Sequence, residues 1–317
     1  MYDVAALGEL LIDFTCLSTD TDGYPTMAAH PGGAPANYLA ALTKFGAKTA
    51  MIGKVGNDAF GRLLIKTLKG AGIDTRGMLV SDDVFTTLAF VTLDDSGNRE
   101  FSFARKPGAD TQLRFDEIDL GVIDASKVLH FGTLSMTNEP ARDATYKAVE
   151  YAAGHGKLIS FDPNLRKPLW DDLDEAKRQM LWGLKHADIV KISDEETEFL
   201  FGIAPEEAAK HIIDSFGVRL VYVTCGAEGC FYRTKTASGF VKALSGIAVK
   251  DTTGAGDIFG GSSMYGLLKA GGVPEKLTAE ELKEIVSFAC ASAGLSTTRA
   301  GGISSVAELI EVEAAMK

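Results

Sequence analysis

The sequence Asp251-Thr252-Thr253-Gly254-Ala255-Gly256-Asp257 lies between an alternating segment, residues 240–249, and a Gly-rich apolar segment, residues 258–268. The alternation predicts a strand, and the apolar run predicts a buried helix. Because the turn between them is nearly bare of side chains, successive backbone N–H groups at Gly254–Gly256 can point at one spot. The N-terminus of the following helix adds positive potential there. This strand–turn–helix unit therefore predicts an α/β fold with an anion site, most often for phosphate.

Asp257 places a carboxylate at the edge of the predicted anion site. A carboxylate that can take a hydroxyl proton beside a phosphate cradle favours a kinase for a small alcohol. Two alternatives stay open. An Asp in the first helical turn is often only a cap. The spacing of Gly254, Gly256 and Gly260 also resembles a dinucleotide-binding turn of a dehydrogenase, although such a turn usually opens a fold and this one comes late in the chain.

Composition limits the classes of protein that this chain can represent. The chain has 317 residues, of which 46% are hydrophobic and 24% charged, as in ordinary globular proteins. The net charge of -11 argues against nucleic acid or an anionic membrane surface as a partner. The four cysteines include no Cys-x-x-Cys pair, and the first residues lack the basic start of a signal peptide. We therefore expect a cytoplasmic protein with reduced thiols and no zinc site.

Strand and helix patterns alternate regularly from residue 127 onward, which predicts a doubly wound, mostly parallel sheet with helices on both faces. The predicted strands are residues 4–7 (continued by 10–12), 48–52, 86–93, 99–103, 128–131, 158–161, 189–192, 220–224, 230–233 and 240–243. The predicted helices are residues 38–45, 62–69, 141–153, 173–185, 195–201, 206–216, 258–270, 278–295 and 305–315. Residues 14–31 are polar and rich in turn residues.

A β-hairpin is predicted where residues 94–98, Asp-Asp-Ser-Gly-Asn, separate the β-rich arms 86–93 and 99–103. One face of this hairpin is too apolar to lie in water alone, so it could form a flap over a site. Ligands of parallel sheets bind at the carboxyl ends of the strands. The polar residues at those ends include Asp13, Asp162, Asn164, Ser193 and Thr224.

Several spaced motifs together resemble the PfkB-type, ribokinase-like sugar kinases, and most of all the fructokinases. The first family signature is similar to residues 32–37 (Gly-Gly-Ala-Pro-Ala-Asn) together with Gly46, Gly53, Gly56, Asp58 and Phe60-Gly61. The second signature is similar to residues 251–257. Residues 8–14, 161–166 with 169–170, and 191–196 resemble fructokinase stretches. The resemblance covers nearly all of the chain. It implies one α/β domain, residues 1–317, with a small β-sheet lid from about 14–31 and 85–106 that often mediates dimerisation.

The resemblance also implies an activity: transfer of the ATP γ-phosphate to a sugar hydroxyl, converting D-fructose to D-fructose 6-phosphate. Asp257 would be the base, and the backbone of Gly254, Ala255 and Gly256 the anion hole. The implied sugar ligands are Asp13, Gly32, Gly33, Asn37, Arg105 and Arg166, and the implied nucleotide contacts are Ser193, Glu196, Thr224, Gly226 and Gly229. Glu196 would hold Mg²⁺ through water, and a K⁺ site would involve Asp251, Thr253, Ser296, Gly301 and Ser305.

Some of these assignments compete with plainer ones. Asn37 could cap the helix that is predicted to start at Tyr38, and Arg105 and Arg166 could form surface ion pairs. Both arginines could also bind a sugar-acid carboxylate, as in 2-keto-3-deoxygluconate kinases. Ser193 departs from the family's usual Asn-x-x-Glu, as fructokinases often do.

The partners that we expect are a small sugar and ATP, neither nucleic acid nor a membrane, and a second copy bound through the lid. A catalytically silent scaffold of the same fold is the alternative outside the enzymes. The intact Gly254–Asp257 set argues against that alternative.

Overall fold

The computed structural model describes residues 1–93 and 99–317, so the turn of the predicted hairpin, residues 94–98, lies outside the described residues. The strands are β1 (Tyr2–Leu7), β2 (Leu11–Thr19), β3 (Pro25–Gly32), β4 (Thr49–Gly56), β5 (Asp74–Ser81), β6 (Leu88–Leu93), β7 (Arg99–Ala104), β8 (Ser126–Gly132), β9 (Leu158–Asp162), β10 (Ile189–Ser193), β11 (Leu220–Thr224), β12 (Gly229–Arg233) and β13 (Ser238–Lys242). The α-helices are α1 (Ala34–Lys44), α2 (Ala59–Gly70), α3 (Leu120–Asp124), α4 (Ala141–Gly154), α5 (Leu173–His186), α6 (Asp194–Phe201), α7 (Pro205–Phe216), α8 (Ala255–Lys269), α9 (Ala279–Ser296) and α10 (Leu309–Ala315).

The main sheet has nine strands in the order β13-β12-β11-β10-β9-β8-β1-β4-β5. All neighbours from β11 to β5 pair in parallel, and only β12 and β13 add antiparallel pairs at one edge. The chain passes from β1 outward to β4 and β5, and then returns to β8 on the other side of β1. The doubly wound, mostly parallel fold is therefore confirmed. Its topological switch point lies between β1 and β8, where such sheets bind ligands.

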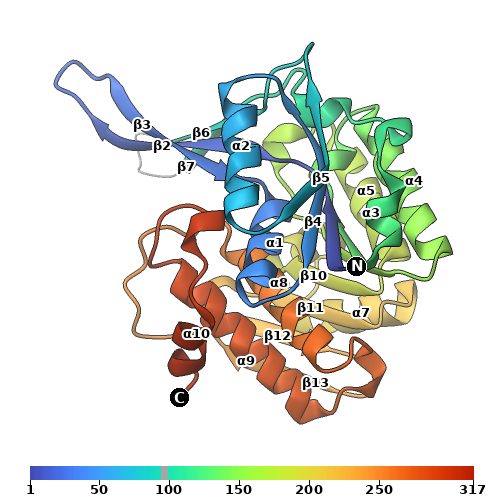
Figure 1. Cartoon of the computed structure of the whole chain (residues 1–317). Coiled ribbons are helices and arrows are strands. Elements are labelled where there is room, and N and C mark those ends of the chain that lie inside the picture. The colour runs from blue at the N-terminus through green and yellow to red at the C-terminus, as the bar shows by residue number, and fades with distance from the viewer. Residues whose placement is uncertain (94–98) are drawn as a thin grey trace.

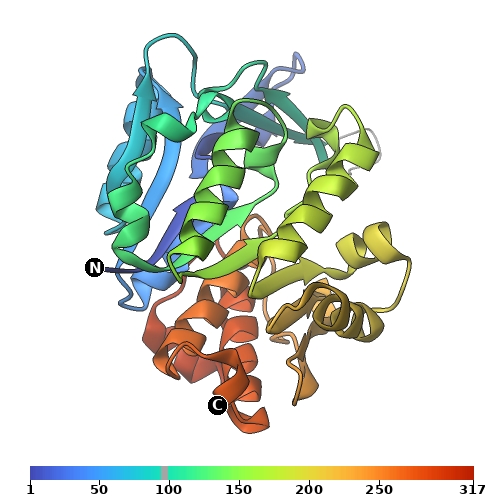
Figure 2. The same ribbon diagram turned by 90° about the vertical axis from the view of Figure 1, so that its right-hand side faces the viewer.

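Both faces of this sheet are covered by helices, because successive side chains of a strand point to opposite faces. In β1, Val4 and Ala6 belong to one hydrophobic cluster, and Ala5 and Leu7 to the other. Apolar residues of α1, α2, α8, α9 and α10 complete the first cluster, and those of α3, α4, α5 and α7 complete the second. Figures 1 and 2 show the two helical layers on either side of the strands. No helix among the described residues is long and apolar enough to cross a membrane.

A second sheet of four strands, in the order β3-β2-β6-β7, projects from one side of the main body (Figure 1). The predicted pairing of the hairpin arms is confirmed, since β6 and β7 are antiparallel. The continuation of the first strand through residues 10–12 is wrong, because the chain turns at Gly8 and Leu11 begins β2 of the other sheet. Residues 14–31 are mostly strand, although their polar sequence indicated turns. A sheet with much of its surface in water does not need an apolar face along its whole length.

Helix α1 begins at Ala34, four residues before the predicted start. Gly33 at its N-cap has a φ of 117°, and Pro35 lies in its first turn, where proline is tolerated. Strand β5 and the short helix α3 were not predicted. The predicted helix 305–315 begins only at Leu309, and strand character after residue 240 ends at Lys242.

Candidate active site

The turn before α8 is held in place by the carboxylate of Asp251. Its Oδ1 accepts hydrogen bonds from Thr253 N (2.9 Å) and Thr253 Oγ1 (2.7 Å), and its Oδ2 accepts one from Gly301 N (3.0 Å). Gly254 is the N-cap of α8 with a φ of 74°, and a Cβ there would lie 3.0 Å from Asn37 Nδ2. Glycine is therefore required both by the left-handed backbone and by the close neighbour.

Asp257, in the first turn of α8, is 8% exposed and is held by two side-chain amides. Asn37 Nδ2 donates to its Oδ2 (2.9 Å) and Asn164 Nδ2 to its Oδ1 (3.1 Å). Burial raises the pKa of Asp257, while Asn37, Lys191, Arg166 and Asn164 oppose that rise. Each oxygen keeps a further lone pair, so the carboxylate can still accept a proton.

Two of the plainer alternatives for these residues are wrong. Helix α8 has no side-chain cap hydrogen bond, so Asp257 does not act as its cap. Asn37 is not an N-cap either, because it lies inside α1 and is buried. Its amide instead joins α1 to α8 across the switch point of the sheet.

Asn164, which follows β9, was named as a strand-end residue but received no role from the sequence. Its backbone has a left-handed φ of 46°, which is uncommon outside glycine. Asp162 Oδ1 accepts a hydrogen bond from Asn164 N (3.1 Å), which is the short-range contact of an Asx-turn. The Asp-Pro-Asn order was the available signal, because Asn tolerates this conformation better than most residues.

A polar cavity of about 350 Å³ opens on the Asp257 side of the turn, and we call it the sugar-side cavity. It brings together most of the residues that were predicted to hold the sugar. Its lining is Glu9, Leu11, Asp13, Gly33, Ala34, Asn37, Phe103, Leu134, Asn164, Arg166, Thr252, Thr253, Gly254 and Asp257. Gly32 lies beside the lining, and a Cβ there would overlap the Asp13 carboxylate.

The sugar-side cavity contains three carboxylates, those of Glu9, Asp13 and Asp257, and one guanidinium, that of Arg166. Burial raises the pKa of Asp13 to about 7, with Arg166 opposing and Asp257 and Asp251 adding to the rise. Burial likewise raises the pKa of Glu9 to about 7. The sequence interpretation missed Glu9, whose Oε1 accepts a hydrogen bond from Ala34 N at the start of α1 (2.8 Å).

Arg105 does not line the sugar-side cavity. It is 5% exposed and pairs with Asp110 (Nη2–Oδ2 2.7 Å), while it also donates to Thr137 Oγ1 (2.8 Å) and to the Leu134 carbonyl oxygen (2.8 Å). The surface ion pair considered for Arg105 is therefore wrong, because the pair is buried. Arg105 borders a different cavity of about 400 Å³, and of the two predicted arginines only Arg166 reaches the sugar side.

A second cavity, of about 510 Å³, lies on the other side of the turn, and we call it the nucleotide-side cavity. It contains the predicted nucleotide residues Thr224, Gly226 and Gly229, around the end of β11 and the start of β12. The remaining lining is mostly small and apolar: Ala227, Ala243, Leu244, Gly246, Ile247, Val249, Thr252, Ala255, Gly256, Phe259, Cys290, Ala293, Gly294 and Thr297. Thr252 lines both cavities, so the turn forms their common wall.

Ser193 and Glu196 line neither cavity and form the capping box of α6. Glu196 N donates to Ser193 Oγ (3.2 Å), and Ser193 N donates to Glu196 Oε2 (2.8 Å). Serine at position 193 fills an N-cap role that asparagine could also fill, since both are preferred N-cap residues. Glu196 Oε1 also accepts from Leu165 N (2.7 Å), which joins α6 to the loop after β9.

The described residues contain no group of three or more His, Cys, Asp or Glu side chains that could hold a metal ion. Mg²⁺ usually keeps several waters and binds through one or two carboxylates and substrate phosphates, and the contact of Glu196 with this ion stays a prediction. For K⁺, the structure brings Asp251 and Gly301 together. Ser296 Oγ and Ser305 Oγ instead donate to the nearby carbonyl oxygens of Ala293 and Gly302, so that site stays a prediction.

The fold and the site together define an α/β protein with two adjoining cavities and a buried carboxylate at their common wall. Known proteins that are similar to this chain identify its family. The model of the pfkB family of carbohydrate kinases matches residues 1–309. Fructokinase-2 of Solanum lycopersicum is 41% identical over 306 residues, covering 95% of this chain and 92% of that relative.

Two solved structures are similar throughout. The fructokinase of Xylella fastidiosa with bound ATP has a TM-score of 0.91 and 29% identity, covering 100% of this chain and 98% of that one. The fructokinase of Vibrio cholerae O395 with fructose, ADP and calcium has a TM-score of 0.88 and 30% identity, covering 100% and 99%. The chain belongs to the pfkB family of carbohydrate kinases and is an enzyme of the fructokinase type. The dinucleotide-binding and scaffold alternatives are therefore wrong.

Proposed function

We propose that this enzyme phosphorylates D-fructose with ATP to give D-fructose 6-phosphate and ADP. One observation carries the proposal: the turn before α8 is the common wall of a polar and an apolar cavity. Asp257 faces the polar cavity, and Gly256 faces the apolar one. A phosphoryl group that crosses this wall passes the N-terminus of α8, where backbone N–H groups favour an anion.

In the proposed reaction the 6-hydroxyl oxygen of fructose attacks the γ-phosphorus, and Asp257 takes the hydroxyl proton. A new P–O bond forms to the sugar, and the bond between the γ-phosphorus and the β–γ bridging oxygen breaks to release ADP. The backbone N–H groups of Gly254 and Gly256 stabilise the charge on the phosphoryl oxygens, and the N–H of Ala255 joins them when it leaves its 3.3 Å hydrogen bond to the Thr252 carbonyl oxygen. The two amides that hold Asp257 keep its lone pairs in a fixed direction, which supports its role as a base.

The charges of the sugar-side cavity favour a neutral sugar over a sugar acid. Asp13, Asp257 and Glu9 outnumber Arg166, which already lies close enough to lower the pKa values of Asp13 and Asp257. A carboxylate ligand would be attracted by one guanidinium only and repelled by Asp13 and Glu9 as they ionise near pH 7, whereas hydroxyl groups can donate hydrogen bonds to carboxylates. The V. cholerae structure with fructose and ADP, similar over the whole chain, supports the same substrate class.

Mg²⁺ on the nucleotide phosphates would neutralise charge as the phosphoryl group moves. We propose that Glu196 contacts it through water, because each of its oxygens keeps a lone pair beside one backbone hydrogen bond. Ser193 would act by capping the helix that carries Glu196. The K⁺ site near Asp251 and Gly301 is proposed on the contact between these residues.

We also propose that the four-stranded sheet acts as a lid on the sugar-side cavity. Phe103 of β7 lines that cavity together with Leu11 and Asp13 of β2, which supports this role. The edge strands β3 and β7 could pair with a second copy to form a homodimer, and light scattering at several concentrations would test it. A cytoplasmic location stays a prediction from the sequence.

An ADP-release assay with fructose, mannose, ribose and 2-keto-3-deoxygluconate tests the proposed substrate. We expect the highest kcat/KM for fructose, with a product whose phosphate lies on O6 by ³¹P–¹H NMR. A higher kcat/KM for the sugar acid would overturn the proposal and would assign Arg166 to its carboxylate. Release of ADP without a phosphorylated sugar would also contradict it.

A further inference from the structure

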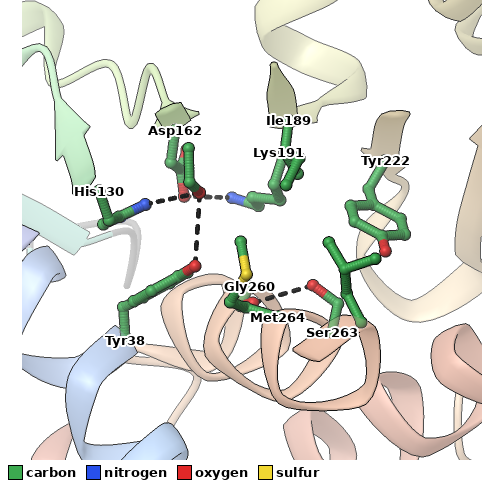
Figure 3. Close-up of a pocket in the computed structure, with 11 residues that line it drawn as sticks. Tyr38, His130, Asp162, Ile189, Lys191, Tyr222, Gly260, Ser263 and Met264 are labelled. Atoms are coloured by element: carbon green, nitrogen blue, oxygen red, sulfur yellow. Dashed lines mark hydrogen bonds and ion pairs between the residues drawn. The ribbon is translucent and has the colours of Figure 1, made fainter. Parts of the chain in front are cut away.

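A buried polar cluster lies between α8 and the strands of the main sheet. It shares no lining residue with the sugar-side cavity or the nucleotide-side cavity. It surrounds a space of about 10 Å³, about the size of one water molecule. Side chains from α1 and from four neighbouring strands face this space: Tyr38, His130, Ser160, Asp162, Lys191 and Tyr222. Figure 3 shows Asp162 and Lys191 pointing toward each other above α8. The activity proposed above uses neither residue.

Lys191 supplies the positive charge of this cluster. Its Nζ lies 3.1 Å from Asp162 Oδ2, and only 12% and 6% of the two side chains are exposed. Burial disfavours the ammonium, but Asp162, Glu196 and Asp257 together raise the pKa of Lys191 above its ordinary value. Burial, with Lys191 nearby, lowers the pKa of His130 to about 3, so that ring is neutral at pH 7.

The Lys191 ammonium also lies directly against the turn that separates the two cavities. A Cβ on Gly256 would lie 3.0 Å from Lys191 Nζ. The next residue is Asp257, whose pKa Lys191 lowers. The absence of a side chain at Gly256 therefore lets a buried cation approach the backbone beside the base.

Asp162 connects this cation to the amide that holds the base. Its Oδ2 pairs with Lys191, and its Oδ1 accepts from Asn164 N (3.1 Å), which supports the left-handed backbone of Asn164. Asn164 Nδ2 in turn donates to Asp257 Oδ1. A continuous set of contacts thus runs from Lys191 through Asp162 and Asn164 to Asp257.

We propose that Asp162 and Lys191 are positioning residues for Asp257: together they hold the Asn164 amide on its carboxylate and place a buried positive charge beneath it. The proposal rests on the role of Asp257 as base given above. Lys191 and Arg166 face Asp257 with positive charge. Asp13 and Asp162 face it with negative charge when they are ionised, and burial raises the pKa of each of them to about 7. Removing Lys191 therefore disfavours the ionised base, while removing the charge of Asp162 favours it.

A purely structural ion pair makes a different prediction. Removing one partner of a buried ion pair destabilises the fold, because the other charge is left uncompensated. In that case both substitutions would change unfolding and leave the base unaffected. The two roles therefore differ in whether the pKa of Asp257 moves: a structural pair predicts no change, and the positioning role predicts opposite changes in the two variants.

The test measures that pKa directly by ¹³C NMR of the side-chain carboxyl carbons of aspartate, without substrates, with the Asp257 signal assigned from Asp257→Asn. We expect Lys191→Met to raise the pKa of Asp257 and Asp162→Asn to lower it. The side-chain amide introduced by Asp162→Asn keeps an acceptor oxygen for Asn164 N, so the second variant preserves the Asx-turn. Lys147→Met, which removes an exposed lysine paired with Asp143, is the matched control and should change nothing.

Kinetics provide the second measurement. In Lys191→Met we expect kcat at pH 7 to fall roughly 10- to 100-fold and to recover at higher pH, because each unit of pKa changes the ionised fraction about tenfold. Both KM values should stay within about threefold of the wild type. In Asp162→Asn the fall in kcat toward acidic pH should move to lower pH.

Unchanged pKa values of Asp257 in both variants would overturn the proposal, as would a change in the same direction in both. A rise in KM for ATP of more than about tenfold with an unchanged pH profile would also overturn it, since Lys191 would then act on the nucleotide. If Lys191→Met does not fold, Asp162→Asn alone decides through the direction of its shift. A wild type that phosphorylates no sugar contradicts the proposed function, whereas the NMR titration still decides the inference.

Discussion

The two cavities on either side of the turn before α8 are built in opposite ways. The sugar-side cavity holds three carboxylates and a guanidinium, on segments that extend from residue 9 to residue 257. The nucleotide-side cavity is lined mostly by small and apolar side chains, all between residues 224 and 297. If the proposed function is right, the first cavity binds its ligand through charge and hydrogen bonds from distant segments, and the second through its shape within one part of the chain.

Because of this difference, we expect sugar selection and phosphoryl transfer to depend on different residues. Under the proposed function, exchanging side chains such as Asp13 and Arg166 should change the sugar that is bound while the turn stays the same. The turn itself depends on backbone, because Gly254 has a left-handed φ and Gly256 packs against Lys191. If the two cavities act independently, some substitutions should change only the binding of the sugar and others only the binding of ATP. Substitutions in the common wall should change turnover.

The largest effect is expected at the common wall. Asp257→Asn should lower kcat about 10²- to 10⁴-fold, because an amide cannot take the hydroxyl proton. Isothermal titration should still detect ATP binding, since Asp257 does not line the nucleotide-side cavity. Asp116→Asn, the same change at an exposed residue, is the control. Turnover near the wild-type value in Asp257→Asn would remove the base assignment.

A smaller effect, confined to the KM for the sugar, is expected for Asp13→Asn. Loss of a carboxylate that accepts hydroxyl hydrogen bonds should raise KM for fructose roughly 10- to 100-fold, with KM for ATP unchanged. The pKa of Asp13 is raised to about 7 by burial, so its carboxylate forms as the pH rises from 6 to 8. KM for fructose should therefore fall over this range in the wild type and stay flat in the variant. Equal pH profiles for the two proteins would count against Asp13 as a sugar ligand.

For Ala293→Leu we expect weaker binding of ATP and unchanged binding of the sugar. This substitution adds bulk to the wall of the nucleotide-side cavity on α9. KM for ATP should rise roughly tenfold, because overpacking costs about 1–3 kcal/mol. KM for fructose should not change, since Ala293 does not line the sugar-side cavity. A parallel rise in both constants would mean that the two cavities are not independent.

The smallest effect is expected at Glu9, a buried carboxyl with a pKa raised to about 7. The unfolded chain loses this proton at lower pH than the folded one, so the contribution of Glu9 to stability is lost as the pH rises toward 7. Glu9→Gln should therefore raise the free energy of unfolding by about 1 kcal/mol at pH 8 and leave it unchanged at pH 4. Urea unfolding measures both values, with the exposed Glu284→Gln as control. A loss of stability at pH 8 would show that the hydrogen bond to Ala34 N needs the charge.

Much of the fold could be predicted because its signals are local. The main-sheet strands from β8 to β12 were predicted within about two residues, since buried parallel strands are short apolar runs bounded by turn residues. The nucleotide side was predictable for a similar reason, because Thr224, Gly226, Gly229 and the turn before α8 lie close together in the sequence. The residue pattern alone did not indicate strands β2 and β3, because a sheet partly in water shows little apolar pattern, although the resemblance implied a small β-sheet that includes residues 14–31.

The sugar side was harder to predict, because its contacts join segments that are far apart. Asn37 and Asp257 are 220 residues apart, and their hydrogen bond corrected the interpretation of Asn37 as a cap. Arg105 and Arg166 looked equivalent in the sequence, but Asp110 and Thr137 hold Arg105 away from the cavity. Glu9 and Lys191 lie in stretches that resemble fructokinases, but the residue pattern of these stretches does not distinguish a buried functional charge from an ordinary one.

The sequence by itself determined the alternation of strands and helices, the Gly-rich turn before α8 and the family to which both belong, because short-range sterics and hydrophobic periodicity act within a few residues. Only the tertiary structure decided which charges share a cavity, which arginine reaches it, and which amides hold Asp257. Those outcomes depend on burial and on distances between segments. Desolvation and charge–charge interactions, which change pKa values, arise only when the fold brings the groups together.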